Sequence, residues 1–153
     1  MKGEIMHSRM VNFKSIDYAK RLNIYAETGH ALTLEDWQLL QARNIFFNII
    51  FSAGVTSPVE ITIPSGSQLI SLDYNSLMKW VPRQRVAIVL HEIGHSLNPT
   101  LMGEDGEFAA DQYAVDRGYG EDIIASLNFG IENFPLEFDK LITRDRIQRI
   151  INF

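Results

Sequence analysis

The chain has 153 residues, enough for one domain with a substantial core, and its 46% hydrophobic and 22% charged residues are ordinary for a globular protein. A net charge of −5 disfavours nucleic acid and anionic membranes as main partners, since both attract basic surfaces. The absence of cysteine excludes a disulfide framework, a thiolate metal site and a cysteine nucleophile, and it fits a cytoplasmic location.

The first half is predicted to contain two core-forming helices followed by two strands. Residues 15–27 carry apolar side chains at helical spacing, and Gly29 is expected to stop that helix. Thr33 is a predicted N-cap for a helix that runs through Ile49 and closes at Gly54. Alternating, β-branched residues then predict strands over 59–63 and 68–74, with a turn at Ser65-Gly66 between them. No segment is predicted to span a membrane, because the most apolar stretch, 44–59, is short and interrupted by polar residues.

The second half is predicted to be helical. Proline suits the first position of a helix, so one is expected from Pro82 to Leu97, where Asn98-Pro99 ends it. Further helices are expected over residues 106–117, 121–133 and 144–152. This order of helices, strands and helices predicts an α+β fold in one domain, residues 1–153.

The motif His91-Glu92-Ile93-Gly94-His95 lies inside the best-defined predicted helix. A spacing of four residues puts both imidazoles on one face, a turn apart, where they can reach the same ion. Imidazole is a good zinc ligand, and two of them leave room for a third protein ligand and a water. Glu92 lies beside that face, where its carboxylate could accept a proton from the water. The alternative interpretation is that the two histidines of this helix have unrelated structural roles.

The third ligand is expected among the acidic residues that follow. The metzincin pattern needs glycine and histidine where this chain has Asn98 and Leu101, so that class is excluded. Glu107 and Asp111 would share a helical face, where one could ligate the ion while the other accepts a hydrogen bond from an imidazole. An acidic helix start exposed to solvent would show the same pattern. The glycines at 103 and 106 predict that residues 104–105 belong to a loop.

Here the sequence resembles a known family. HEIGH followed by EFAADQYAVDRGYG looks like the gluzincin metallopeptidases, and ExxAD-x-x-A and the final RDRIQRI are similar to HtpX-like gluzincins. The resemblance implies a zincin-like fold, with two N-terminal helices, a small sheet, the HExxH helix and a glutamate helix. It also implies one Zn²⁺ per chain held by His91, His95 and Glu107, with Glu92 as base and Asp111 supporting a ligand. It covers roughly residues 59–153, with strong motifs only in 90–118.

The chain departs from HtpX-like proteins in two respects. Those proteins have membrane helices, and none is predicted here. Only the 11 residues 96–106 separate the second histidine from Glu107, a compactness similar to the soluble minigluzincins and to the ImmA/IrrE family. The sequence does not decide among these branches.

The predicted function is that of a zinc-dependent endopeptidase acting on a peptide or protein. The alternative is a non-catalytic zinc-binding regulatory or partner-binding protein, which the retention of Glu92 disfavours. By analogy with gluzincins, strand 68–74 would pair with an extended substrate; otherwise substrate-binding residues remain unassigned. Candidates for stabilising the oxyanion are His30, Tyr113, Tyr119, Arg144 and Arg146, since Ile142-Thr143 replaces the His-Pro common in HtpX-like proteins.

Overall fold

A computed structural model describes residues 7–51, 63–135 and 139–152 of the chain. It divides into two compact units, Met1–Pro82 and Arg83–Phe153, and each is described by itself. The described residues are mostly helical and include one small parallel sheet, which confirms the α+β prediction. The prediction of a single domain is not tested by this division and stays a prediction.

Three helices open the first unit: α2 (Phe13–Arg21), α3 (Tyr25–Ala31) and α4 (Leu34–Ala42). The prediction of one helix over residues 15–27 was wrong, because Asn23 adopts a left-handed φ of 57° and separates α2 from α3. Thr33 caps α4 as predicted, and its hydroxyl accepts the backbone N–H of Asp36 at 3.1 Å.

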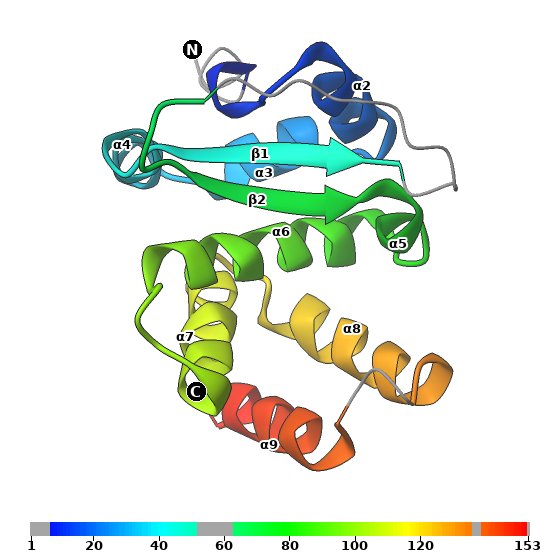
Figure 1. Cartoon of the computed structure of the whole chain (residues 1–153). Helices are drawn as coiled ribbons and strands as arrows, with labels where there is room; N and C mark the ends of the chain where they lie inside the picture. The colour runs from blue at the N-terminus through cyan, green and yellow to red at the C-terminus, as the bar shows by residue number, and fades with distance from the viewer. Residues whose placement is uncertain (1–6, 52–62, 136–138, 153) are drawn as a thin grey trace. The chain divides into compact units, whose positions relative to one another are not determined.

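Strands β1 (Ile45–Ile50) and β2 (Gln68–Asp73) lie side by side and run parallel, with Ile45 opposite Gln68 (Figure 1). The prediction that the helix from Thr33 continues to Ile49 was therefore wrong. Asn44, with a φ of 50°, ends the helical path, and the β-branched and aromatic run that follows suits a strand. Gly54 and residues 59–62 of the other predicted strand lie outside the described residues.

The core of the first unit lies between these helices and the sheet. The turn at Ser65-Gly66 is confirmed. Gly66 has a φ of 79°, a backbone conformation that would be strained in a residue with a side chain. A short helix, α5 (Tyr74–Met78), follows β2 directly and was not predicted. The largest fully buried side chains of this unit are Trp37, Phe47, Leu22, Ile24, Leu32, Leu40 and Ile45.

The second unit contains α6 (Pro82–Leu97), α7 (Gly103–Val115), α8 (Gly120–Asn133) and α9 (Lys140–Ile151). Helix α6 begins and ends at the predicted residues. Helices α7, α8 and α9 pack against one another in pairs (Figure 1). Side chains of α6 and of α9 each reach α7, and the candidate site lies where they meet it.

Helices α7 and α9 of the second unit begin three and four residues earlier than predicted, and α8 begins one residue earlier. Helix α7 includes residues 104–105, so the prediction of a loop there was wrong; acidic residues in a first helical turn are favoured by the helix dipole. Helix α9 begins at Lys140, because the Asp139 side chain accepts the backbone N–H of Leu141 and Ile142 and caps it. Thr143, expected before the helix, lies inside it and is buried.

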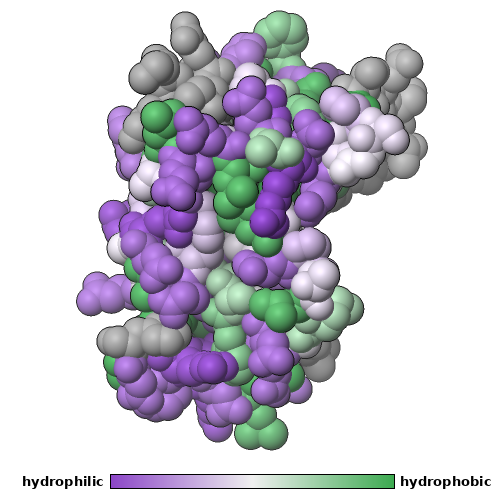
Figure 2. Space-filling model, turned by 90° about the vertical axis from the view of Figure 1, so that its left-hand side faces the viewer, coloured by the Kyte–Doolittle hydropathy of each residue, from purple (hydrophilic) through white to green (hydrophobic). Residues whose placement is uncertain are grey.

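None of the helices in the described residues has the length and apolar character needed to cross a membrane. On the face drawn in Figure 2, hydrophilic residues predominate and apolar ones form small groups among them. The exposed large apolar side chains come from separate elements, and the most exposed are Phe13, Met102 and Leu141.

Candidate metal centre

Helix α6 presents two imidazoles toward each other. His91 and His95 lie one turn apart, and their Nε2 atoms are 3.0 Å from each other. The two rings are nearly perpendicular, with an interplanar angle of 87°. The apolar neighbours of His91, including Leu90 and Ile93, are fully buried and hold this face of the helix inward. The predicted placement of both imidazoles on one helical face is thus observed.

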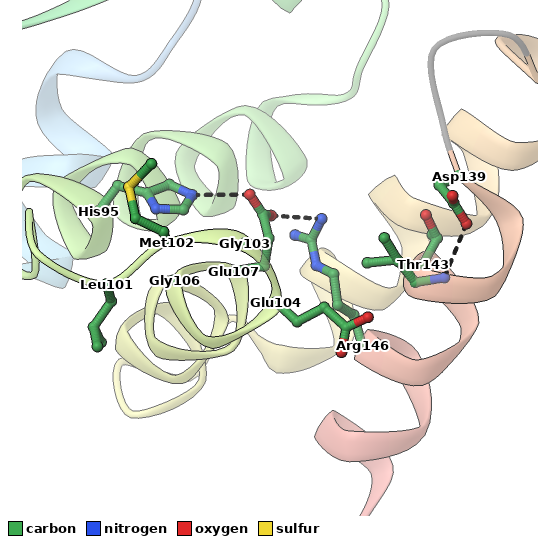
Figure 3. Close-up of a pocket in the computed structure, with 11 residues that line it drawn as sticks. His95, Leu101, Met102, Gly103, Glu104, Gly106, Glu107, Asp139, Thr143 and Arg146 are labelled. Atoms are coloured by element: carbon green, nitrogen blue, oxygen red, sulfur yellow. Dashed lines mark hydrogen bonds and ion pairs between the residues drawn. The ribbon is translucent and has the colours of Figure 1, made fainter.

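Helix α7 brings a carboxylate to the same place. Glu107 Oε2 lies 3.5 Å from His91 Nε2, and its Oε1 lies 3.3 Å from His95 Nε2. Figure 3 shows the His95 ring pointing at this carboxylate. Among the described residues, these three side chains form the group that could hold a metal ion, with ligand atoms all within 4.8 Å of one another.

The separations within this group suit a tetrahedral ion. Bonds of about 2.0–2.2 Å from zinc to nitrogen and oxygen put neighbouring ligand atoms about 3.3–3.6 Å apart. The two nitrogens are 3.0 Å apart, slightly less than that range. Each nitrogen lies within the range from one Glu107 oxygen, His95 from Oε1 at 3.3 Å and His91 from Oε2 at 3.5 Å. Two imidazole nitrogens at such a distance repel unless a proton or a cation lies between them. The donor set therefore fits a divalent cation.

Asp111 supports one of these imidazoles from the next turn of α7. Its side chain is almost fully buried, and its Oδ1 lies 2.9 Å from His91 Nδ1. Because an ionised carboxylate can only accept a hydrogen bond, Nδ1 carries a proton. In the neutral ring, that leaves the lone pair of Nε2 directed at His95 and Glu107, as metal binding requires.

Arg146 of α9 holds both carboxylates. Its Nε donates to Asp111 Oδ2 and its Nη2 to Asp111 Oδ1, both at 2.8 Å. Its Nη1 lies 2.8 Å from Glu107 Oε2 (Figure 3). The sequence suggested Arg146 only as one of five oxyanion candidates, and nothing in RDRIQRI distinguished it from Arg144 or Arg149. Its contact with Asp111 spans 35 positions of the chain.

The other oxyanion candidates lie elsewhere. Arg144 is exposed on α9, and His30 belongs to α3 of the first unit. The Tyr113 ring is covered by the guanidinium of Arg117 at 3.3 Å, and Tyr119 is buried beneath Arg83 at 4.6 Å. Among the four candidates in the second unit, Arg146 is the residue that pairs with Glu107 and Asp111 of the group.

Charge and burial shift the pKa values of these groups. Burial lowers the pKa of His91, but hydrogen bonds with Asp111 and Glu107 outweigh it and raise that pKa from 6.5 to about 9. Hydrogen bonds with His91 and His95 hold the pKa of Glu107 well below its usual value, against burial. Burial opposes ionisation of Asp111, yet hydrogen bonds from Arg146 and His91 lower its pKa. Both carboxylates are therefore ionised at neutral pH.

Glu92 follows His91 on α6 and is half-buried. Burial lowers the pKa of Arg146, while its hydrogen bond with Asp111 and the charges of Asp111, Glu107 and Glu92 outweigh this and raise it. The Glu92 carboxylate is thus close enough to the cluster for its charge to act there. Glu104 and Asp105 are exposed in the first turn of α7, outside the group that could hold an ion.

Two glycines allow the close approach that builds the site. A Cβ at Gly94 would lie 2.7 Å from Ala110 Cα and 3.0 Å from Tyr113 Cβ, so glycine lets α6 and α7 touch. A Cβ at Gly106 would lie 2.8 Å from the carbonyl oxygen of Leu101. From the sequence, Gly94 had no assigned role, and Gly106 was predicted to be the first residue of a helix that follows a loop at 104–105. The sequence did contain a signal for the role of Gly94, because it is a glycine between two candidate ligands on an otherwise apolar helical face.

A cavity of about 600 Å³ opens beside the histidine and the glutamate. Figure 3 shows its walls, formed by the end of the α6–α7 connection, the first turns of α7 and the start of α9. The lining combines apolar, acidic and basic side chains: Leu101, Met102, Ile142, Glu104, Asp139, Arg146 and the two candidate ligands His95 and Glu107. Its volume is in the range of small-molecule and peptide side-chain pockets.

Comparison with known proteins adds no family. No protein-family model, curated protein or solved structure matches this chain. The chemistry of the site therefore has to be inferred from its own residues. Two imidazoles and a carboxylate could hold a metal ion, a second carboxylate is hydrogen-bonded to His91, and a cavity adjoins the group.

Proposed function

We propose that this chain is a zinc-dependent endopeptidase of the gluzincin type with a zincin-like fold. The observation that carries the proposal is that His91 Nε2, His95 Nε2 and the Glu107 carboxylate lie close enough together to hold one ion, with a further carboxylate, Glu92, directly after the first of them in the sequence. Histidine, histidine and glutamate form the ligand set of catalytic zinc sites that keep a position open for water.

Each residue has a defined role in this proposal. Zinc, when bound, supplies a Lewis acid that lowers the pKa of a water molecule and polarises the substrate carbonyl. Glu92 would serve as the base, taking up a proton from the attacking water on its carboxylate and returning it to the leaving amine. Asp111 keeps the His91 imidazole in the tautomer that ligates, and the adjoining cavity accepts a substrate side chain. The pairing of strand β2 with a substrate remains an expectation from the gluzincin resemblance.

The competing candidate is a non-catalytic zinc protein that uses the same ligands for stability. It has no use for a carboxylate beside the open position of the ion, so Glu92 separates the two functions. Substituting this residue changes chemistry without removing a ligand, which makes the two candidates distinguishable in one variant.

The experiment measures zinc content and peptide cleavage in the same preparations. Wild type and Glu92→Gln are expected to hold about one zinc per chain, whereas His91→Ala and His95→Ala lose tight binding. Cleavage of a peptide library, followed by mass spectrometry, is expected for wild type and is expected to disappear in Glu92→Gln. Zinc binding without any cleavage by wild type would favour the non-catalytic protein. Stoichiometric zinc in the double histidine variant would refute the site itself.

A further inference from the structure

The two oxygens of the Glu107 carboxylate have different surroundings. Oε2 forms an ion pair with Arg146, whose Nη1 lies 2.8 Å away, and it is also the oxygen paired with His91 Nε2, at 3.5 Å. Oε1 is directed at His95 Nε2, 3.3 Å away. One oxygen is therefore engaged by a cation of the protein, while the other faces the imidazole that would share the metal ion.

Arg146 cannot easily follow a movement of this carboxylate. Its Nε and Nη2 are both bound to Asp111, which is 1% exposed, and its own side chain is 13% exposed. A planar guanidinium with two of its nitrogens fixed holds the third in a set direction. The Glu107 carboxylate thus forms an ion pair with a guanidinium that is itself held in place by Asp111.

Whether a glutamate ligates zinc through one oxygen or two decides how many positions remain. With two histidines and one glutamate oxygen, a four-coordinate ion keeps one position for water; a second glutamate oxygen would compete for it. An arginine paired with one carboxylate oxygen favours orientations in which the other oxygen faces the ion, so it biases this choice.

We propose that Arg146 is a positioning residue that restricts Glu107 to one-oxygen ligation, through Oε1, and so reserves a coordination position for water. The inference rests on the proposed zinc site and goes beyond it, since it assigns the openness of that site to a residue on a different helix. Asp111 then has two tasks: it orients His91 and anchors the guanidinium that orients Glu107.

Zinc affinity is a poor measure of this role. Removing Arg146 takes a positive charge away from the site, which strengthens attraction for a cation, but it also releases Glu107 and Asp111, which weakens binding. These effects act in opposite directions. The number of oxygen atoms around the ion responds to the orientation of Glu107 alone and is the decisive quantity.

The experiment compares zinc-loaded wild type with Arg146→Gln, Arg146→Lys and the matched control Arg149→Gln. Arg149 lies on the same helix, and Arg149→Gln removes the same charge. The Arg149 guanidinium, however, covers the Phe108 ring at 3.8 Å. X-ray absorption at the zinc edge is expected to give about four nearest neighbours in wild type and in Arg149→Gln. Arg146→Gln is expected to give about five, the added one being oxygen. Cobalt substitution gives the same comparison by visible absorption.

Arg146→Lys tests orientation against charge. Lysine keeps the charge but has no planar fork to span Asp111 and Glu107, so about five neighbours are expected here too. Four neighbours in both Arg146 variants would overturn the proposal, and so would four in Arg146→Lys alone. Circular dichroism establishes that each variant is folded, and the lysine variant keeps the test intact if the glutamine variant does not fold. Failure of wild type to bind zinc would instead refute the proposed function.

Discussion

Replacing Gly94 by alanine should disturb the metal site without touching a ligand. The new Cβ would lie 2.7 Å from Ala110 Cα, whereas ordinary contacts are 3.4–4 Å, so α6 and α7 must separate by at least about 0.7 Å at this point. Neither the new Cβ nor Ala110 Cα can move by a change of rotamer, because both are fixed by the helix backbone. The overlap is therefore relieved only if the helices move. The displacement is transmitted along α7 to Glu107, one turn before Ala110.

The expected effects follow from this displacement. Moving the Glu107 carboxylate by about 0.7 Å exceeds the roughly 0.5 Å tolerance of a metal site, and we expect zinc affinity to fall about 10–100-fold. Overpacking costs about 1–3 kcal/mol, while replacing a helical glycine by alanine returns about 0.5–1 kcal/mol. The free energy of unfolding should therefore fall by about 0–2.5 kcal/mol.

Gly29 provides the matched control. It lies in α3, and a Cβ there would meet no atom within 4 Å, so Gly29→Ala should raise the free energy of unfolding by about 0.5–1 kcal/mol and leave zinc affinity unchanged. Urea denaturation measures stability, and competition with a chromophoric chelator measures zinc affinity. If Gly94→Ala bound zinc as tightly as wild type, the link between helix separation and the ligand set would be refuted.

The remaining predictions concern the acidic residues and pH. Glu107→Ala should lose zinc as completely as a histidine variant, whereas Glu104→Ala and Asp105→Ala should change metal content little; a Glu107 oxygen more than about 4 Å from zinc in a crystal structure would contradict the first. Asp111→Ala should weaken zinc affinity or activity about 10–100-fold, measured by chelator competition, and an unchanged affinity and activity would remove its supporting role. After chelation, the raised pKa of His91 should stabilise the fold fully below pH 6.5, and this stabilisation should be lost as pH rises through about 9. Zinc replaces the proton, so denaturation of the loaded protein should show no such loss.

Helix α6 could be predicted because its signals are local. Proline at its first position, apolar residues at helical spacing and Asn98-Pro99 after its end all lie within the segment itself. The same spacing fixed the relation between His91 and His95, so the central pair of the candidate site followed from the sequence alone.

Strand β1 was missed because its sequence carries no alternation. Five of its six residues are buried or half-buried, so apolar residues occur on both faces, and Leu40, Ile45 and Ile49 also fit helical spacing. The break between helix and strand lies at Asn44, which has a left-handed conformation. Asparagine adopts this conformation more readily than most residues, but its presence in a sequence does not predict it. Only the pairing with β2, 23 positions along the chain, decides for a strand.

The part of the site that depends on distant segments could not be derived in the same way. Arg146 was one of three arginines on a predicted helix, and its selection depends on how α9 packs against α7. The helical state of residues 104–105 was hidden by two glycines that suggested a loop. Gly106 is in fact needed where α7 passes the carbonyl of Leu101, which is a requirement of packing and not of a turn.

The balance of charge connects the raised pKa of His91 to the proposed ion. With His91 protonated, its charge and that of Arg146 offset the charges of Glu107 and Asp111. A divalent cation that replaces the proton adds one positive charge, which Glu92 offsets. The carboxylates that hold a proton on His91 are thus the groups that would attract a cation, and the protein interior favours sites whose charges sum to about zero. The raised pKa of His91 between Glu107 and Asp111 thus reports the same negative charge that would attract a cation. Glu92 would supply the further negative charge that a divalent ion needs for balance.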